Sequence, residues 1–179
     1  MKARLIELLK KYSVKYSTEK EFLLASGKKS RFYINCKQTI LRAEGLYLTG
    51  NLVLNEIKEL EIDAVGGLTF GADPVAMATA FASASQKNPV NAFSIRKEKK
   101  DHGISRWIEG SVKKGGKAVI IDDVATTGGS AIKAIERAKS EGLDIVGAVI
   151  LVDREEGGLE NIKKYVPFAK AVIKRSELV

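Results

Sequence analysis

The chain has 179 residues, of which 45% are hydrophobic and 29% are charged, and its formal net charge is +8. This length and composition suit one globular domain with a well-buried core. They exclude a membrane-spanning segment, because no apolar run approaches the roughly 18 residues that a span needs. They also exclude a zinc site of the Cys/His type, because the chain has one Cys and one His.

The positive charge favours an anionic partner, and nucleic acid, phosphorylated metabolites and anionic membranes all qualify. Dispersed lysines are equally typical of an ordinary solvated surface. The N-terminal stretch lacks the uninterrupted apolar segment of a signal peptide, so we expect a cytoplasmic protein. Cys36 cannot form an internal disulfide, and any metal should be held by oxygen ligands.

The first third of the chain predicts helix, turn, strand and helix. Residues 2–12 have apolar side chains at helical spacing, which favours packing over membrane binding. Residues 26–30 form a turn that carries two cations, and residues 31–36 have the β-branched and aromatic content of a strand. This pair is typical of a plain hairpin as well as of a binding loop. Residues 43–60 predict the next helix.

The middle of the chain predicts a strand over 62–65 and a Gly-rich loop over 66–73, followed by a helix with Asp73 as its N-cap. Residues 90–95 predict a further strand. The polar run that follows it is too long and too charged for a simple connection.

From Lys117 onward, strands and helices alternate regularly. The predicted elements are strand 117–121, helix 128–141, strand 144–152, helix 158–164 and strand 168–173. This order predicts an α/β fold with a mainly parallel sheet that helices flank on both faces. In such sheets ligands bind beyond the carboxyl ends of the strands, so the loops after residues 65, 95, 121 and 152 are candidate site loops.

The strongest signal is AVIIDDVATTGGS at 118–130, where an apolar strand meets Asp122 and Asp123 and then a turn rich in Thr and Gly. Backbone N–H groups at a strand-to-helix turn bind phosphate well. Two carboxylates would repel a phosphate, so they favour hydroxyls or a metal. Simple helix capping explains one Asp but not two, and the common G-x-x-x-x-G-K and G-x-G-x-x-G patterns are absent.

The other three loops have weaker signals. The loop after 65 carries glycines that allow a close ligand or form an ordinary turn. The loop after 95 gathers cations around His102 and is either a ligand loop or a solvated charge run. After 152, Arg154 is placed either to bind a carboxylate through two hydrogen bonds or to form a surface salt bridge.

VIIDDVATTGGS resembles the phosphoribosyl-diphosphate (PRPP) signature of the type I phosphoribosyltransferases. SGKKSRFYIN at 26–35, RKEKKDHG at 96–103 and LVDREEG at 151–157 are similar to the orotate phosphoribosyltransferase family in order and spacing. The resemblance covers nearly the full chain. Two positions depart from the family pattern: Ala25 stands where many members have Lys, and residues 69–74 lack a Lys that several members carry.

The resemblance implies transfer of ribose 5-phosphate from PRPP to orotate, in pyrimidine biosynthesis, with Mg²⁺ bound mainly through PRPP and no metal ligands of the protein's own. It implies one domain over 1–179, in which about residues 1–40 and the C-terminal end form a hood over the base. It also implies a homodimer that shares the basic loop between subunits, without a nucleic-acid or membrane partner.

The resemblance assigns roles to residues of three kinds. The catalytic residues are Asp122, Asp123, Lys100 and His102. PRPP binds to Arg96, Lys97, Lys100, His102, Asp122, Asp123, Ala125, Thr126, Thr127, Gly128, Gly129 and Ser130. Orotate binds to Ser26, Lys28, Tyr33, Thr126 and Arg154. The alternatives are a phosphoribosyltransferase for a purine or for uracil, and a PRPP-sensing regulator that binds nucleic acid, although no added DNA-binding segment precedes residue 20.

Overall fold

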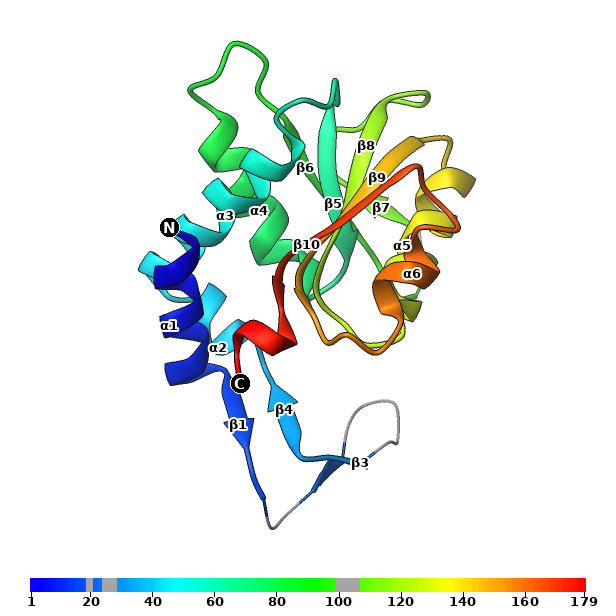
Figure 1. The fold of residues 1–179 in the computed structure, drawn as a ribbon. Coiled ribbons are helices and arrows are strands. Elements are labelled where there is room, and N and C mark those ends of the chain that lie inside the picture. Colours follow the sequence, from blue (N-terminus) through cyan, green and yellow to red (C-terminus); the bar gives the residue numbers. More distant parts are fainter. Residues whose placement is uncertain (19–20, 24–28, 99–106) are drawn as a thin grey trace.

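The computed structural model describes residues 1–18, 21–23, 29–98 and 107–179. Its centre is a six-stranded sheet (Figure 1). The strand order is β10 (Phe168–Lys174), β9 (Asp144–Asp153), β8 (Lys117–Ala125), β5 (Ala64–Leu68), β6 (Asn91–Ile95) and β7 (Ile108–Glu109). Every neighbouring pair is parallel except β6 and β7, which confirms the prediction of a mainly parallel sheet.

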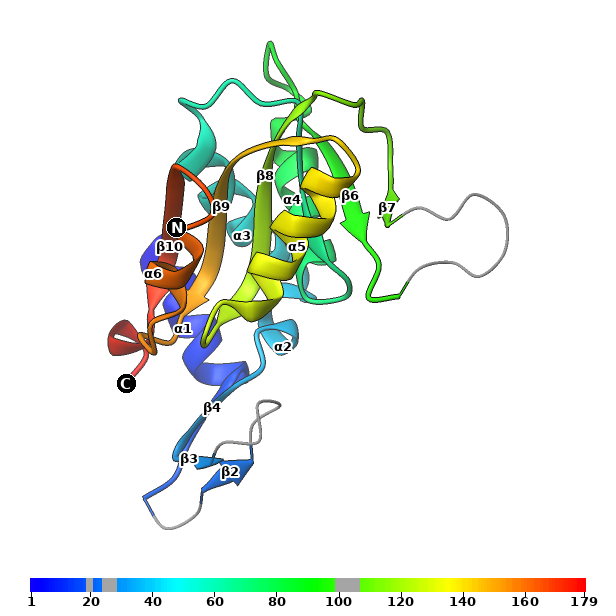
Figure 2. The same cartoon turned by 90° about the vertical axis from the view of Figure 1, so that its right-hand side faces the viewer.

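Helices cover both faces of this sheet (Figure 2). One face carries α3 (Ala43–Ile57) and α4 (Ala72–Ser83), and the other carries α5 (Gly129–Ser140) and α6 (Gly158–Ile162). Alternate strand residues therefore enter two separate apolar cores, because successive side chains of a strand point to opposite faces. For example, Val119 and Ile121 belong to one core, and Ile120 belongs to the other.

The N-terminal segment forms a smaller unit beside the sheet. Helix α1 (Lys2–Tyr12) leads into β1 (Val14–Tyr16), which pairs antiparallel with β4 (Phe32–Ile34). A short pair of β2 (Phe22–Leu23) and β3 (Lys29–Ser30) extends from it, and α2 (Lys37–Ile40) leads back to α3 (Figure 2). The closing 3₁₀ helix η1 (Arg175–Glu177) returns to α1, where Lys2 Nζ lies 2.8 Å from a Glu177 carboxylate oxygen.

The main predicted helices and strands are present, but α2 and the short strands β1, β2, β3 and β7 were not predicted, and two strands run further than expected. Strand β5 continues to Leu68, into the predicted Gly-rich loop, and the more important difference is in β8. We expected this strand to end before the acidic pair, but it continues through Ala125. The reason is its neighbour: β9 is long enough to pair with Asp122, Val124 and Ala125. Both acids are therefore strand residues, held by the sheet rather than by a loop.

A second correction concerns Asp73, which is not the N-cap of α4. The helix begins two residues earlier than predicted, at Ala72, so Asp73 lies inside its first turn. Its carboxylate instead accepts hydrogen bonds from Thr69 Oγ1 at 2.6 Å and from Ser94 Oγ at 2.7 Å. These two bonds hold the loop after β5 against β6.

Candidate active site

The predicted phosphate loop connects the end of β8 to the start of α5. Gly128 has a left-handed backbone with φ of +83°, which glycine adopts without the steric cost of a side chain. The first helical hydrogen bond runs from Ile132 N to Gly128 O at 2.9 Å. The N–H groups of the turn before it have no partner within the helix, so they and the helix dipole favour an anion at this end.

Helix α6 supports the phosphate loop from behind. A β-carbon at Gly128 would lie 2.7 Å from Gly158 O, and one at Gly158 would lie 2.7 Å from Thr126 O. The two backbones can approach this closely only because both positions are glycine. In addition, Asn161 Nδ2 donates to Thr127 O at 3.1 Å. The loop is therefore held in place before any ligand arrives.

The two acids of β8 have different surroundings. Asp122 is 6% exposed, and burial, followed by the neighbouring charge of Asp123, raises the pKa of its carboxyl group to about 8. The side chain of Asp123 is 13% exposed and lies 3.5 Å from Lys37 Nζ. It also closes over Gly71, where a β-carbon would lie 2.5 Å from Asp123 Oδ1. Asp123 is thus the better placed of the two to meet a ligand.

Arg154 follows β9 and lies beside the phosphate loop. Its backbone N–H donates to Ala125 O at 3.0 Å, which ties the two chain segments together. The side chain is only 4% exposed, so the alternative of a salt bridge is confirmed in part: Arg154 does pair with a neighbouring acid, but in a buried position rather than at the surface. One guanidinium nitrogen lies 2.9 Å from a carboxylate oxygen of Glu156 and donates to Phe32 O at 3.3 Å.

The remaining guanidinium contacts of Arg154 place it against the N-terminal segment. The same nitrogen donates to Ser30 Oγ at 3.2 Å, and the group lies over the Phe32 ring. Within the described part of the chain, the buried Nε has no hydrogen-bond partner. A buried cationic donor without a partner is costly, so this site favours a planar anion such as a carboxylate.

The other predicted site residues are distributed around this edge. Tyr33 lies on β4 next to Phe32, with its ring 5.7 Å from that of Phe22. Arg96 follows β6 and donates to a Glu109 carboxylate oxygen at 2.8 and 2.6 Å, while Lys97 is exposed. Four predicted residues lie outside the described ranges: Ser26, Lys28, Lys100 and His102.

Sequence reasoning did not find three residues that the fold brings into contact with predicted site residues. Lys37 reaches Asp123 from α2, Asn161 reaches the phosphate loop from α6, and Arg137 of α5 donates to the carbonyl oxygen of Arg96 at 2.6 Å. None of the three lies in a recognisable sequence motif, because each belongs to an element that is far in the sequence from the site residue it contacts.

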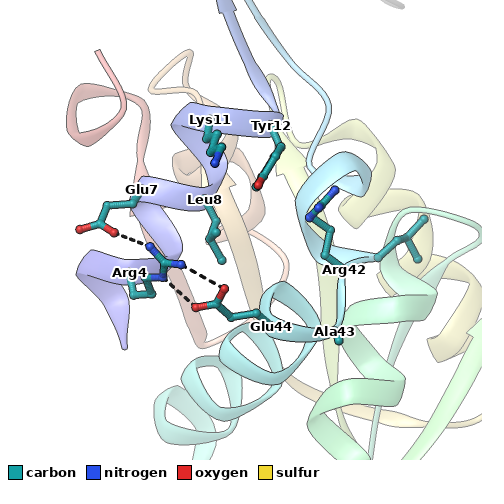
Figure 3. Close-up of a pocket in the computed structure, with 9 residues that line it drawn as sticks. Arg4, Glu7, Leu8, Lys11, Tyr12, Arg42, Ala43 and Glu44 are labelled. Carbon is teal, nitrogen blue, oxygen red and sulfur yellow. Dashed lines mark hydrogen bonds and ion pairs between the residues drawn. The ribbon is translucent and has the colours of Figure 1, made fainter.

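A pocket of about 740 Å³ lies apart from the predicted residues, between α1 and the α2–α3 connection (Figure 3). Both of its acids are paired with one cation: Arg4 lies between Glu7 and Glu44, with hydrogen bonds of 2.7 to 3.2 Å. The Lys11 ammonium lies 5.2 Å from the centre of the Tyr12 ring. Arg42 covers the Tyr12 ring at 4.1 Å. This internal pairing indicates a contact that fixes α1 to the core rather than a substrate site.

No helix in the described ranges has both the length and the apolar character needed to cross a membrane. In those same ranges, no group of three or more His, Cys, Asp or Glu side chains is arranged to hold a metal ion.

The parallel sheet with a phosphate loop and paired acids at its carboxyl edge is the architecture of a phosphoribosyltransferase, and the phosphoribosyl transferase domain family matches residues 54–175. An orotate phosphoribosyltransferase of Aquifex aeolicus (strain VF5) is 46% identical over 98% of this chain and 96% of its own length. One from Synechocystis is 44% identical over 87% of this chain and 77% of its own. The chain belongs to the orotate phosphoribosyltransferase family.

A solved structure gives the same result for the fold. The Mycobacterium tuberculosis orotate phosphoribosyltransferase in complex with PRPP is 29% identical, with a TM-score of 0.79 over 99% of this chain and 91% of that one. The type I fold predicted from the sequence is therefore confirmed.

Proposed function

We propose that the protein transfers ribose 5-phosphate from PRPP to N1 of orotate, forming orotidine 5′-monophosphate and diphosphate in UMP biosynthesis. The observation that carries the choice of base is Arg154. It is a buried cation beside the phosphate loop, its Nε lacks a partner in the described chain, and orotate has a carboxylate to offer. A purine base has no such group, so in a purine enzyme the buried Nε would stay unpaired and Arg154 would serve only its contacts with Glu156, Ser30 and Phe32.

We assign the remaining groups of the two substrates to residues at the same edge of the sheet. We assign the 5′-phosphate to Thr126 through Ser130, where the first turn of α5 supplies N–H donors. We assign the ribose hydroxyls to Asp122 and Asp123, with the direct contact made by Asp123, the more accessible of the two, because a carboxylate accepts hydrogen bonds from hydroxyl groups and repels phosphate. Tyr33 with Ser26 and Lys28 completes the contacts to the base.

The reaction breaks the bond between ribose C1 and the diphosphate oxygen and forms the bond from C1 to orotate N1. The electron pair of the broken bond leaves with diphosphate, and the N1 proton of orotate passes to the departing diphosphate or to water. Positive groups aimed at the departing diphosphate lower this barrier most. We assign that task to Arg96, Lys97, Lys100 and His102.

The donor set also fits Mg²⁺ held mainly by PRPP. Asp122 and Asp123 offer the oxygen ligands that Mg²⁺ prefers, but two carboxylates fall short of a complete octahedral set. The ion would therefore take most of its ligands from PRPP and water, and when bound it would neutralise charge on the diphosphate.

We further propose that two copies form a homodimer that shares the basic loop. Several large apolar side chains of α3 and α4 are exposed, among them Tyr47, Met77 and Phe81. Met77 and Phe81 are four residues apart and so lie on one side of α4. Such exposed apolar groups are typical of an interface. Equilibrium sedimentation should give twice the chain mass, and Phe81→Lys should lower it; a monomer at micromolar concentration would contradict this proposal.

The domain organisation and location are proposals of the same kind. We propose a single domain in which residues 1–40 and the C-terminal end form the hood over the base; the Lys2–Glu177 ion pair and the contact of Arg154 with Ser30 support it. We also propose that the protein works in the cytoplasm, because PRPP is highly charged and does not cross a membrane unaided.

One assay tests the proposed function. Protein, PRPP, Mg²⁺ and orotate are mixed, and the loss of orotate absorbance is followed; Asp123→Asn should lower turnover while leaving the unfolding midpoint unchanged. Adenine, hypoxanthine and uracil serve as competing bases. A folded protein that leaves orotate intact, or that uses one of these bases equally well, would refute the proposal. A salt-dependent gel shift without turnover would favour a nucleic-acid-binding regulator.

A further inference from the structure

Arg137, on the last turns of α5, contacts both sides of the basic segment. Its guanidinium donates to Arg96 O at 2.6 Å and to Lys97 O at 2.9 Å, about 40 residues earlier in the chain. The same guanidinium lies 3.9 Å from the centre of the Trp107 ring. Lys97 precedes and Trp107 follows residues 99–106, which lie outside the described ranges. One side chain therefore joins the two ends of this segment.

The contacts around Arg137 show that this junction is built from several elements. Arg96 N donates to Trp107 O at 2.9 Å, where β6 and β7 begin to pair. Trp107 N donates to a carboxylate oxygen of Glu141, the residue that follows α5. Figure 2 shows α5 running beside β8, with β6 and β7 to one side of it. The two ends thus lie against α5 through both hydrogen bonds and ring stacking.

The opposite end of α5 is the phosphate loop. The helix is 12 residues long, so about 18 Å separate its two ends. Its buried side chains, Ala131, Ala134, Ile135 and Ala138, fix it against the sheet. Because α5 is held firmly, the distance between the phosphate loop at its first turn and Arg137 at its last turn stays constant. Arg137 links the last turn of α5 to the backbone of Arg96 and Lys97, so these two residues also lie at a constant distance from the phosphate loop.

We propose that Arg137 is a positioning residue for phosphoribosyl transfer: through α5 it holds Arg96 and Lys97 at a fixed distance from the 5′-phosphate, so that these cations meet the diphosphate as it leaves. This inference rests on the proposed function. Arg suits the task because its planar fork reaches two carbonyl oxygens and stacks on a ring at once. A Lys at this position would reach one carbonyl.

A purely structural role for Arg137 is the competing explanation, and Lys139 provides the matched control. Lys139 lies on the same helix, and its Nζ donates to Tyr165 O at 2.8 Å. Like Arg137, Lys139 is a cation of α5 that donates to a carbonyl oxygen of another segment. That segment contains Tyr165, precedes β10 and lies away from Arg96. If the bonds only hold α5 in the fold, Arg137→Met and Lys139→Met should behave alike.

The experiment compares wild type with Arg137→Met, Arg137→Lys and Lys139→Met. We expect Arg137→Met to lower kcat and the kcat/KM for PRPP by roughly tenfold or more, because it removes the charge-assisted hydrogen bonds to Arg96 O and Lys97 O. The KM for orotate and the affinity for ribose 5-phosphate, measured by calorimetry, should change less than about twofold. Arg137→Lys should restore part of kcat, and Lys139→Met should retain it all.

Trp107 provides a readout that does not depend on turnover. It is the only tryptophan of the chain, so its emission reports the contact with Arg137. Its emission should change in Arg137→Met and remain as in wild type in Lys139→Met. Equal kinetics of the two Met variants, or a fall in ribose 5-phosphate affinity that follows kcat, would overturn the positioning role. Wild type that lacks orotate turnover would instead refute the proposed function, whatever the emission shows.

Discussion

The two halves of the proposed site are built in different ways. The sugar-phosphate half comes from one continuous stretch, Asp122 to Ser130, in which strand, loop and helix follow one another. The base half joins residues that are far apart in the chain: Arg154 donates to Ser30 Oγ, 124 residues earlier. The first half therefore depends on local backbone geometry, and the second depends on how the N-terminal segment packs against the sheet.

This difference predicts different responses to mutation. A continuous loop supported by α6 should tolerate changes elsewhere and fail when its own backbone is disturbed. A site assembled from distant segments should fail when its central side chain is removed, because no neighbouring residue can take over the contact. The four predictions below test this contrast.

The largest effect should come from Arg154→Ala. Leaving a buried anion without its cation costs about 2–5 kcal/mol, so the kcat/KM for orotate should fall by roughly thirtyfold to several thousandfold. PRPP binding should change little, because the phosphate loop does not use this side chain. Steady-state kinetics with each substrate varied in turn, together with PRPP calorimetry, measure the two effects.

Arg175 provides the control for Arg154. Both guanidinium groups lie over the Phe32 ring, at 5.5 Å for Arg154 and 5.1 Å for Arg175. Arg175→Ala therefore removes a cation from the same ring without removing the proposed carboxylate contact. An equal loss of orotate turnover in both variants would mean that the base half needs only positive charge, and the assignment of Arg154 would be wrong.

The second prediction concerns Asp122 and pH. Its pKa of about 8 in the folded protein lies above the usual 3.8, so the folded state keeps a proton that the unfolded state loses. The stability that this group contributes is complete below about pH 4 and is lost as the pH rises to about 8, at up to about 1.4 kcal/mol per pH unit.

Asp122→Asn should remove this slope in the free protein, without PRPP or Mg²⁺. Urea unfolding at several pH values between 4.5 and 8 measures it, and the exposed Asp144, at the start of β9, provides an Asp→Asn control. Parallel stability curves for wild type and Asp122→Asn would show that the burial of Asp122 has no such effect.

The same contrast explains what the sequence could predict. The sheet, the order of elements and the phosphate loop are local patterns, and the strand-to-helix turn at 126–130 has a recognisable composition of its own. The length of β8 was not predictable, because partner residues on β9 extend it past the acids. Similarly, the sequence pattern of Asp73 is that of a helix cap, and it does not show that the Asp73 carboxylate accepts hydrogen bonds from Thr69 and Ser94 instead. Contacts of Lys37, Arg137 and Asn161 depend on the folded arrangement alone.

The third prediction compares two glycines with nearly the same backbone. Gly128 and Gly115 have φ of +83° and +79°, so Ala at either position costs about 1–2 kcal/mol of backbone strain. At Gly128 the new methyl group would also meet Gly158 O at 2.7 Å, whereas at Gly115 it would meet nothing within 4 Å. Overpacking adds about 1–3 kcal/mol.

Gly128→Ala should therefore lower the free energy of unfolding more than Gly115→Ala, and it alone should raise the KM for PRPP, by displacing the loop from α6. Urea unfolding and initial rates measure both quantities. If both variants lose the same stability and keep the same KM, close packing against α6 does not define the phosphate loop.

The smallest effect should come from Lys37→Met, with Lys170→Met as its control. Lys37 lies 3.5 Å from Asp123 and Lys170 lies 3.2 Å from Glu56, and the two lysine side chains are 39% and 56% exposed. Each pair should contribute less than about 1 kcal/mol to stability.

Only Lys37 touches an acid of the proposed site, and it does so beside Gly71, in the loop that lacks the Lys found in several family members. We therefore expect Lys37→Met to lower the kcat/KM for PRPP by about threefold, whereas Lys170→Met should leave it unchanged. Initial rates at low PRPP decide between them: equal rates in the two variants would mean that the N-terminal segment supplies no cation to the sugar-phosphate half, which would then depend on its own continuous stretch alone.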